Sequence, residues 1–172
     1  METDKYVFFC GHKPNEYGVH IFSQWYPSKF IKILDDKNVI EFVHMEQYMM
    51  AHKALLFGDK YHYDKIMSCS DACKIKNLGR RVRGFKQNIW DKNKLKIVIS
   101  GNKLKFQQNP ELMTRLLETG DKIIVEAACY DKEWGIGLTA QQAIKIPESK
   151  WPGKNLLGKA LMKVRDEAIN GI

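Results

Sequence analysis

The chain has 172 residues, 44% of them hydrophobic and 28% charged, which is enough for one globular domain over residues 1–172 with its own core. It has no stretch of about 18 apolar residues and no apolar segment after Met1, so we expect no transmembrane helix, no signal peptide and a cytoplasmic or otherwise intracellular location. The net charge of +8 is concentrated in one segment, which is considered below. Four cysteines without a CxxC pair or metal-ligand spacing indicate reduced thiols and no zinc site.

The first part of the chain is predicted to form short strands and then a buried helix. Residues 6–10, YVFFC, indicate a strand. FIKIL at 30–34 and VIEFV at 39–43 are separated by DDKN, which predicts a hairpin. Residues 44–57 are apolar on almost every side of a helix, so we expect a buried helix that ends near Gly58.

A basic segment follows two shorter helices, which we expect at 60–68 and 70–78. Between residues 80 and 105 there are nine basic side chains and one acid. Their difference, eight positive charges, equals the net charge of the whole chain. This charge indicates either a phosphate-attracting surface or the solvated face of a helix, and it does not separate nucleic acid from a small phosphorylated substrate. The nine are Arg80, Arg81, Arg83, Lys86, Lys92, Lys94, Lys96, Lys103 and Lys105.

One segment within this region is ambiguous. Residues 95–106 alternate around Gly101-Asn102 as in a hairpin, but they also place apolar side chains on one face of a helix. The next signal is clearer, because Asn109-Pro110-Glu111 combines a cap, a first-turn proline and an acid. It predicts a helix that ends at Gly120.

The C-terminal part is predicted as strand, loop and helix. KIIVEAA at 122–128 indicates a buried strand, and residues 130–153 are mostly loop. Residues 154–169 predict an amphipathic helix. Its inward-facing side chains would be Leu157, Leu161, Val164 and Ala168.

Glu46 and Lys53 are the first candidates for chemistry. They are seven residues apart, so they lie on one face of the buried helix about two turns apart. A carboxylate in so apolar a segment must be paired, protonated or functional. Glu46 either stabilises the helix start through the helix dipole or acts as a catalytic carboxylate or hydroxyl acceptor, and the sequence leaves both open.

The stretch YDKEWGIGL has the composition of a pocket wall. Its glycines would let the backbone approach a ligand closely, and Trp134 offers a flat face for a base or a sugar. Asp131 and Glu133 offer acceptors for ribose hydroxyls. A core position for Trp134 is the alternative, and this Gly-x-Gly is not a dinucleotide fingerprint because it lies outside a strand–helix turn.

Five motifs, taken together and in order, resemble the NADAR family, also described as the YbiA-like N-glycosidases: MEQYMMAHK, LGRRVRGFKQNIW, KFQQNPELMTRLLETGDKIIVEA, DKEWGIGL and WPGKNLLGKALMKVR. The resemblance implies an α+β fold that is mostly helical with a few short strands, and it favours the helix for residues 95–106. It also implies hydrolysis of an N-glycosidic bond. YbiA-like members release a pyrimidine from ribose 5-phosphate in early riboflavin intermediates, and other members remove ADP-ribose from guanine in nucleic acid.

The resemblance also implies roles for individual residues. Glu46 falls on the family's catalytic carboxylate, and Asp131 and Trp134 are the other catalytic candidates. Gln24 stands where the family usually has Asn, which would lengthen the reach of that polar contact, and His44 replaces a Ser or Thr, which predicts a weaker helix cap. The implied substrate-binding residues are Lys53, Arg80, Trp90, Gly135, Asn155 and Gln24.

The implied chemistry agrees with these residue types. Cleaving a C1–N bond develops positive charge on the ribose, which a nearby carboxylate stabilises while cations hold the phosphate. We therefore expect a small phosphoribosylated substrate, no cofactor, no metal and no membrane partner, and we leave the oligomeric state open. With such a substrate Arg80 is the best phosphate contact, and the remaining lysines of the basic segment would form a solvated helix face. Two alternatives stay open: an ADP-ribosyl-guanine hydrolase that binds nucleic acid through the basic segment, and a non-catalytic ADP-ribose or NAD sensor.

Overall fold

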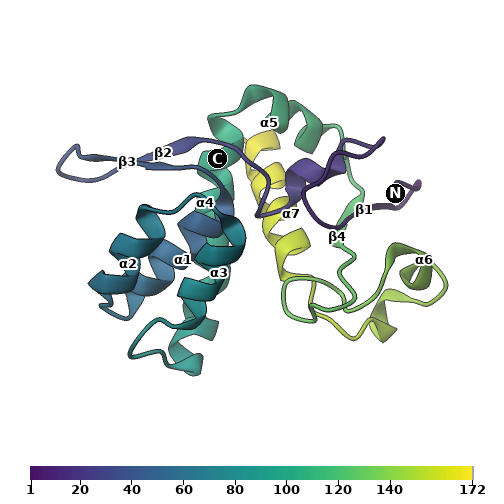
Figure 1. Cartoon of the computed structure of the whole chain (residues 1–172). Coiled ribbons are helices and arrows are strands. Elements are labelled where there is room, and N and C mark those ends of the chain that lie inside the picture. Colours follow the sequence, from purple (N-terminus) through teal and green to yellow (C-terminus); the bar gives the residue numbers. More distant parts are fainter. Residues whose placement is uncertain (172) are drawn as a thin grey trace. The chain divides into compact units, whose positions relative to one another are not determined.

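The computed structural model describes residues 1–171, in which helices predominate over a few short strands, so the α+β prediction is confirmed (Figure 1). The chain divides into two compact units. The terminal unit comprises Met1–Tyr26 and the residues from Pro110 onward, and the central unit comprises Pro27–Asn109. The expectation of a single domain over residues 1–172 stays a prediction. In the part of the chain that is described, no helix is both long enough and apolar enough to cross a membrane.

The terminal unit is built on a parallel pair of strands. Its elements are β1 (Tyr6–Phe9), η1 (Val19–Phe22), α5 (Pro110–Leu117), β4 (Ile123–Glu126), α6 (Ala140–Ala143), η2 (Glu148–Lys150) and α7 (Leu156–Ile169). β1 and β4 pair with Phe9 opposite Glu126, and α7 packs against β4. Both predicted strands and the proline-initiated helix are therefore confirmed.

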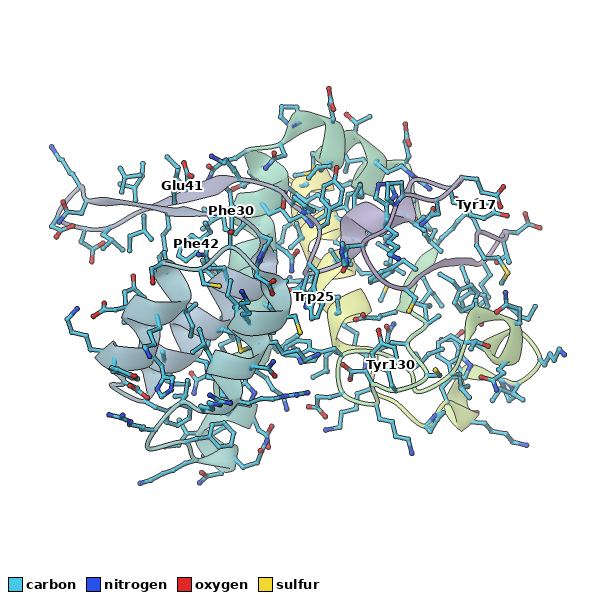
Figure 2. The ribbon with its side chains drawn as sticks, viewed as in Figure 1. Tyr17, Trp25, Phe30, Glu41, Phe42 and Tyr130 are labelled. Carbon is cyan, nitrogen blue, oxygen red and sulfur yellow. The ribbon has the colours of Figure 1, made fainter. Side chains whose placement is uncertain are left out.

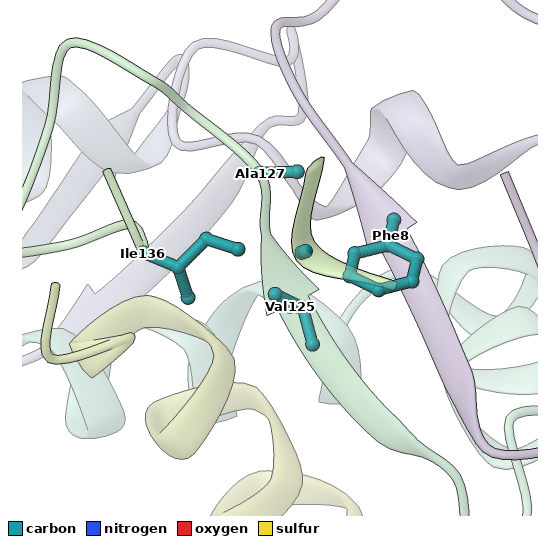
Figure 3. Close-up of a cluster of buried hydrophobic side chains, with 5 residues drawn as sticks. Phe8, Val125, Ala127 and Ile136 are labelled. Carbon is teal, nitrogen blue, oxygen red and sulfur yellow. The ribbon is translucent and has the colours of Figure 1, made fainter. Parts of the chain in front are cut away.

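Apolar side chains join this strand pair to the loop that follows β4 (Figure 3). The cluster is formed by Phe8, Val125, Ala127, Ile136 and Ala143. Ile136 comes from the WGIGL stretch, so that loop is anchored through its own apolar residue. The loop is thus part of the core of its unit as well as part of its surface.

The buried face of α7 differs from the prediction at its end. Leu157, Leu161 and Val164 are buried as expected, but Ala168 is exposed, so the prediction is wrong there. Arg165 takes an inward position instead, because its Nη1 donates to Thr119 Oγ1 at 3.0 Å and to the Lys122 carbonyl at 2.8 Å. A hydrogen-bonded guanidinium therefore occupies part of the face that apolar periodicity alone would assign to small residues.

The central unit combines a hairpin with four helices. Its elements are β2 (Phe30–Ile33), β3 (Val39–Phe42), α1 (Met45–Leu56), α2 (Lys60–Met67), α3 (Ala72–Arg80) and α4 (Gln87–Gln107). The antiparallel hairpin is confirmed, and the Phe30 and Phe42 rings stack with centroids 5.6 Å apart (Figure 2). Tyr48 of α1 meets Phe42 edge-on at 4.9 Å, which places the hairpin's inner face on the helices.

Helix α4 confirms the helical alternative for residues 95–106. Gly101 lies within the helix, where an added Cβ would come within 2.5 Å of the Tyr48 ring. The glycine therefore permits close packing of α4 on α1 instead of forming a turn. Gly79 of α3 has the corresponding role on α1, because any Cβ there would overlap Met50.

The N-terminus of α1 is capped by the His44 side chain, and whether this cap is weaker than one made by Ser or Thr stays a prediction. His44 Nδ1 accepts a hydrogen bond from the Gln47 N–H at 3.1 Å, and its Nε2 contacts the Ser70 carbonyl at 3.1 Å. Burial lowers the pKa of His44 and so favours the neutral ring. Only a neutral ring leaves Nδ1 free to accept, so histidine replaces the usual hydroxyl as the cap.

Side chains from the end of α4 pair with the outer edge of β2. Gln108 Oε1 accepts from the Ile31 N–H and Gln108 Nε2 donates to the Ile31 carbonyl, both at 2.8 Å. Asn109 Nδ2 donates to the Lys29 carbonyl at 3.0 Å. Three main-chain groups of this edge are thus satisfied by side-chain amides in place of another strand.

Candidate active site

In the central unit, α1 carries Glu46 in its first turn and Lys53 about two turns further on. Glu46 is 3% exposed. The Lys53 ammonium lies 4.3 Å from the centre of the Phe85 ring and 5.5 Å from that of Trp90. Two aromatic faces therefore surround a cation on the same helix as a buried carboxylate.

The pKa of Lys53 reflects its surroundings. Burial lowers this pKa, the Glu46 carboxylate raises it, and the Arg80 guanidinium lowers it further. Arg80 can approach because Gly79, next to it, lets α3 pack closely on α1. We call Glu46, Lys53, Arg80, Phe85 and Trp90 the α1 cluster. Within it the structure brings together all four candidates that the sequence predicted in this unit.

Phe85 was missed by the sequence reasoning. Gly84, with φ of +67°, turns the chain just before it, and Phe85 then packs edge-on against Phe57 with centroids 5.2 Å apart. The available signal was a glycine followed by an aromatic residue a few positions before Trp90. An aromatic residue that stays 39% exposed beside a lysine is consistent with a binding surface.

The basic segment is partly buried, contrary to the prediction of a solvated helix face. Lys94 is 6% exposed and pairs with Asp91, and Lys105 is fully buried. Burial lowers the pKa of Lys105 to about 7. The prediction fails for these two lysines because α4 packs on α1 and β2, so its buried face is wide. The exposed members are Arg80, Arg81, Arg83, Lys86, Lys92 and Lys96.

The other candidates lie in the terminal unit, where Asp131 shapes the loop after β4. Its Oδ1 accepts from the N–H groups of Glu133 and Trp134, both at 2.8 Å. Glu133 forms an ion pair with Lys154 at 2.7 Å. Trp134 is intermediate in exposure, so it is neither a fully buried core residue nor a free surface one. The predicted ribose contacts of these acids stay predictions.

Gly135 lies close to the main chain at the end of β4, which precedes its loop. A Cβ at Gly135 would lie 2.8 Å from the Glu126 carbonyl, which also accepts from the Ile136 N–H at 3.0 Å. A glycine is therefore needed here to seat the loop on the end of β4. An additional approach to a ligand stays a prediction.

Asn155 is tied to β4 through both ends of its amide. Its Oδ1 accepts from the Glu126 N–H at 3.0 Å, and its Nδ2 donates to the Ile124 carbonyl at 2.9 Å. Its backbone is left-handed, with φ of 52°, which asparagine tolerates better than most residues. These contacts give Asn155 a structural role, and its predicted role in substrate binding is not tested by them.

Gln24 follows η1 and is 7% exposed. Within the described residues, neither its amide oxygen nor its amide nitrogen has a hydrogen-bond partner. Buried amides in proteins are nearly always hydrogen-bonded. Gln24 is therefore a buried amide whose hydrogen-bonding capacity is unused within the described residues, and its role in substrate binding stays a prediction.

A cavity of about 740 Å³ in the terminal unit involves none of these candidates. Its walls are mostly apolar, and they include Met1, Phe8, Phe9, Val19, Ala127 and Ala140. Glu16 is the one carboxylate in this lining, and no lysine or arginine accompanies it. Glycosyl transfer to water from a phosphorylated sugar uses a carboxylate together with cations, so the chemistry is better argued from the α1 cluster than from this cavity. Among residues 1–171 there is no group of three or more His, Cys, Asp or Glu side chains that could hold a metal ion.

Comparison with known proteins identifies the family. The NADAR domain matches residues 8–168. The chain is 68% identical over 167 residues to an N-glycosidase of Acanthamoeba polyphaga mimivirus, covering 97% of this chain and 98% of that protein. It is 30% identical over 122 residues to a riboflavin biosynthesis protein of Vibrio vulnificus, covering 71% of this chain but 29% of that protein.

A solved structure agrees with the fold. The NMR structure of the Escherichia coli protein YbiA superposes with a TM-score of 0.75 at 24% identity, over 99% of this chain and 89% of that one. The expected enzyme class, a hydrolase of N-glycosyl bonds, is thus confirmed at the level of named relatives. With nearly the whole sequence matched and the fold shared, the chain belongs to the NADAR domain family.

Proposed function

We propose that this protein hydrolyses the C–N bond between ribose 5-phosphate and a pyrimidine amine, as found in early intermediates of riboflavin synthesis. The observation that carries the proposal is the α1 cluster, in which a buried carboxylate, two cations and two aromatic rings share one side of α1. The names of an N-glycosidase and a riboflavin biosynthesis protein among its relatives support the reaction and the substrate class.

In this proposal the carboxylate, the cations and the aromatic rings of the α1 cluster have different roles. Loss of the pyrimidine amine develops positive charge at C1 of the ribose, and the Glu46 carboxylate stabilises that charge and orients the attacking water. Lys53 and Arg80 provide positive charge for the 5-phosphate. Phe85 and Trp90 offer apolar faces to the sugar or the base and exclude water from the reacting bond.

Gln24 of the terminal unit supports a polar ligand as well. Its unpartnered buried amide provides one donor and one acceptor for a hydroxyl or a carbonyl of the substrate. Asp131 and Trp134 contribute as predicted from the family pattern, Asp131 by holding the loop that presents the Trp134 indole.

A product assay tests the proposal. The purified chain is incubated with phosphoribosylated pyrimidine intermediates, with NAD and with ADP-ribosylated guanine, and release of the sugar phosphate is followed over time. We expect ribose 5-phosphate to accumulate with the first substrate, at a rate proportional to protein concentration. Turnover of ADP-ribosylated guanine alone would replace this proposal by the nucleic-acid alternative, and binding without turnover would replace it by the sensor.

A further inference from the structure

The loop between α3 and α4 carries the aromatic residue that faces Lys53. Phe85 lies in this loop, with its ring centre 4.3 Å from the Lys53 ammonium. Gly84 gives the loop a left-handed turn, and no helix or strand includes residues 81–86. Something other than regular secondary structure must therefore hold Phe85 in place.

Asp59 provides that support from the start of α2. Its Oδ2 accepts from the Arg83 N–H at 2.7 Å and from His62 Nδ1 at 2.6 Å, and its Oδ1 accepts from the His62 N–H at 3.1 Å. The carboxylate is buried, with 3% of the side chain exposed. These bonds lower the pKa of Asp59 to about 2, with the Arg83 N–H as the largest cause. A charged acceptor thus fastens the loop across 24 residues of sequence.

The geometry exceeds what capping a helix requires. A helix N-cap uses one side-chain oxygen, as Asp71 does at the start of α3, where its Oδ1 accepts from the Lys74 N–H at 2.8 Å. Asp59 uses one oxygen as the cap and the other for the loop. A second contact on the same loop supports this, because the Arg83 guanidinium lies 4.8 Å from the centre of the Tyr61 ring on α2.

We propose that Asp59 is a positioning residue, which holds the 81–86 loop so that Phe85 covers Lys53 and confines its ammonium to the direction in which it meets a phosphorylated sugar. The inference rests on the proposed function for the identity of the ligand. The hold on the loop is a separate claim, which can be measured without any turnover.

Asp59→Asn is the variant that tests the claim. Asparagine keeps an oxygen for the cap but puts an NH2 group where Arg83 and His62 donate, so the loop loses its acceptor. Asp59→Ser, which also caps a helix and also lacks the second acceptor, serves if the first variant does not fold. Asp71→Asn is the matched control, because it makes the same change at a cap whose carboxylate accepts from a main-chain N–H of its own helix.

Two measurements are made on each variant. Trypsin cleavage at the exposed Arg81, Arg83 and Lys86 reports on the loop, and we expect it to be about 10-fold faster in Asp59→Asn, since cleavage follows local opening. Affinity for ribose 5-phosphate, measured by calorimetry, is expected to fall about 5- to 10-fold, with kcat within about two-fold, because positioning for binding is lost and the chemistry is not. The control should change neither.

Phe85→Leu links the two measurements. In the wild-type background it should weaken ribose 5-phosphate binding as Asp59→Asn does, and combining the two changes should add less than about two-fold, because both act through one contact. Additive losses, or faster cleavage with unchanged affinity and KM, would overturn the positioning role. Unchanged cleavage in both Asp59 variants would overturn the hold on the loop. If the wild-type chain does not bind ribose 5-phosphate, the proposed function fails, and the cleavage rates still decide whether Asp59 holds the loop.

Discussion

In the α1 cluster the charged groups of Glu46 and Lys53 lie on one helix, and burial and neighbouring rings hold them. In the loop after β4, Asp131 and Asn155 use their polar atoms on main-chain groups of their own unit. Both sets were predicted to serve the same reaction. A substitution in the first set removes a charge or a ring from a group of side chains. A substitution in the second set removes hydrogen bonds to the main chain.

The two regions represent two different roles for polar residues in a motif. A polar residue can recur in a pattern because it touches the ligand or because it shapes the loop that does. Conservative changes to the charged groups of the α1 cluster should therefore alter ligand binding or turnover and leave stability nearly intact. Changes at Asn155 should do the opposite, and the following measurements test the contrast.

The largest effect is expected from Glu46→Gln. The change is nearly isosteric but removes the negative charge, so turnover should fall roughly 100-fold or more, the scale of losing one electrostatic or acid–base group. Steady-state kinetics on the substrate found by the product assay measure it. Glu41→Gln on the exposed side of β3 is the matched control and should leave turnover unchanged. Turnover within two-fold of wild type would remove Glu46 from the mechanism.

Asn155→Ala should instead lower the free energy of unfolding by roughly 2–4 kcal/mol. It deletes two hydrogen bonds to β4, leaves their main-chain partners buried, and places alanine in a left-handed conformation. Urea denaturation measures the loss, and Asn77→Ala on the exposed face of α3 provides the comparison. If Asn155→Ala kept its stability but lost ligand affinity, the contrast between the two regions would be wrong.

A smaller effect should appear as a pH dependence of stability in the central unit. His52 donates from Nδ1 to the Tyr48 carbonyl at 2.8 Å and accepts at Nε2 from Lys32 at 3.0 Å, so its ring is neutral. Burial lowers the pKa of His52 from 6.5 to about 4. The unfolded chain therefore binds a proton first, and stability is lost as pH falls from about 6.5 towards 4, by on the order of 1–3 kcal/mol. His52→Gln should flatten this slope in denaturation measured from pH 7 to 4.5, and an unchanged slope would assign it to other groups.

The smallest effect is expected from changing Lys92 and Lys96 together to Gln. Both are exposed on α4, and charges at a distance are screened beyond about 8 Å at physiological salt, so activity on a phosphoribosyl pyrimidine should stay within about two-fold. Arg80→Ala in the α1 cluster should raise KM roughly 10-fold or more, the scale of a lost charge-assisted contact. If the lysine pair mattered as much as Arg80, with a flatter salt dependence, the nucleic-acid alternative would be favoured.

Local sequence signals predicted the strands, the hairpin and most helix positions, because alternation, caps and glycine stops act over a few residues. They failed where a distant partner decides. Gly101 is compatible with a turn when only its neighbours in sequence are considered, but Tyr48 packs on it within a helix. Ala168 is exposed, whereas Arg165 of the same helix is buried through its hydrogen bond to Thr119. Lys94 and Lys105 were predicted to face solvent because they are charged, but α4 buries a wide face that includes both side chains.

In the candidate site, too, features set by local sequence were predicted and features set by distant partners were missed. The spacing of Glu46 and Lys53 predicted that they share a helix face, and the family pattern added Arg80 and Trp90. Phe85 and Asp59 were missed, because their roles depend on contacts made across the α1–α4 helices. Pairings such as Asp59 with the Arg83 N–H leave no local periodicity for the sequence to reveal.

The amide of Gln108 on the edge of β2 has a consequence for how this protein behaves when concentrated. A hairpin with Ile33 and Val39 exposed on one face, 65% and 57% respectively, would be prone to intermolecular strand addition if its edge were open. Gln108 occupies the N–H and the carbonyl of Ile31 at that edge, so an incoming strand would first have to displace a side chain already bonded at both ends. We therefore expect Gln108 to oppose aggregation through this edge of the hairpin.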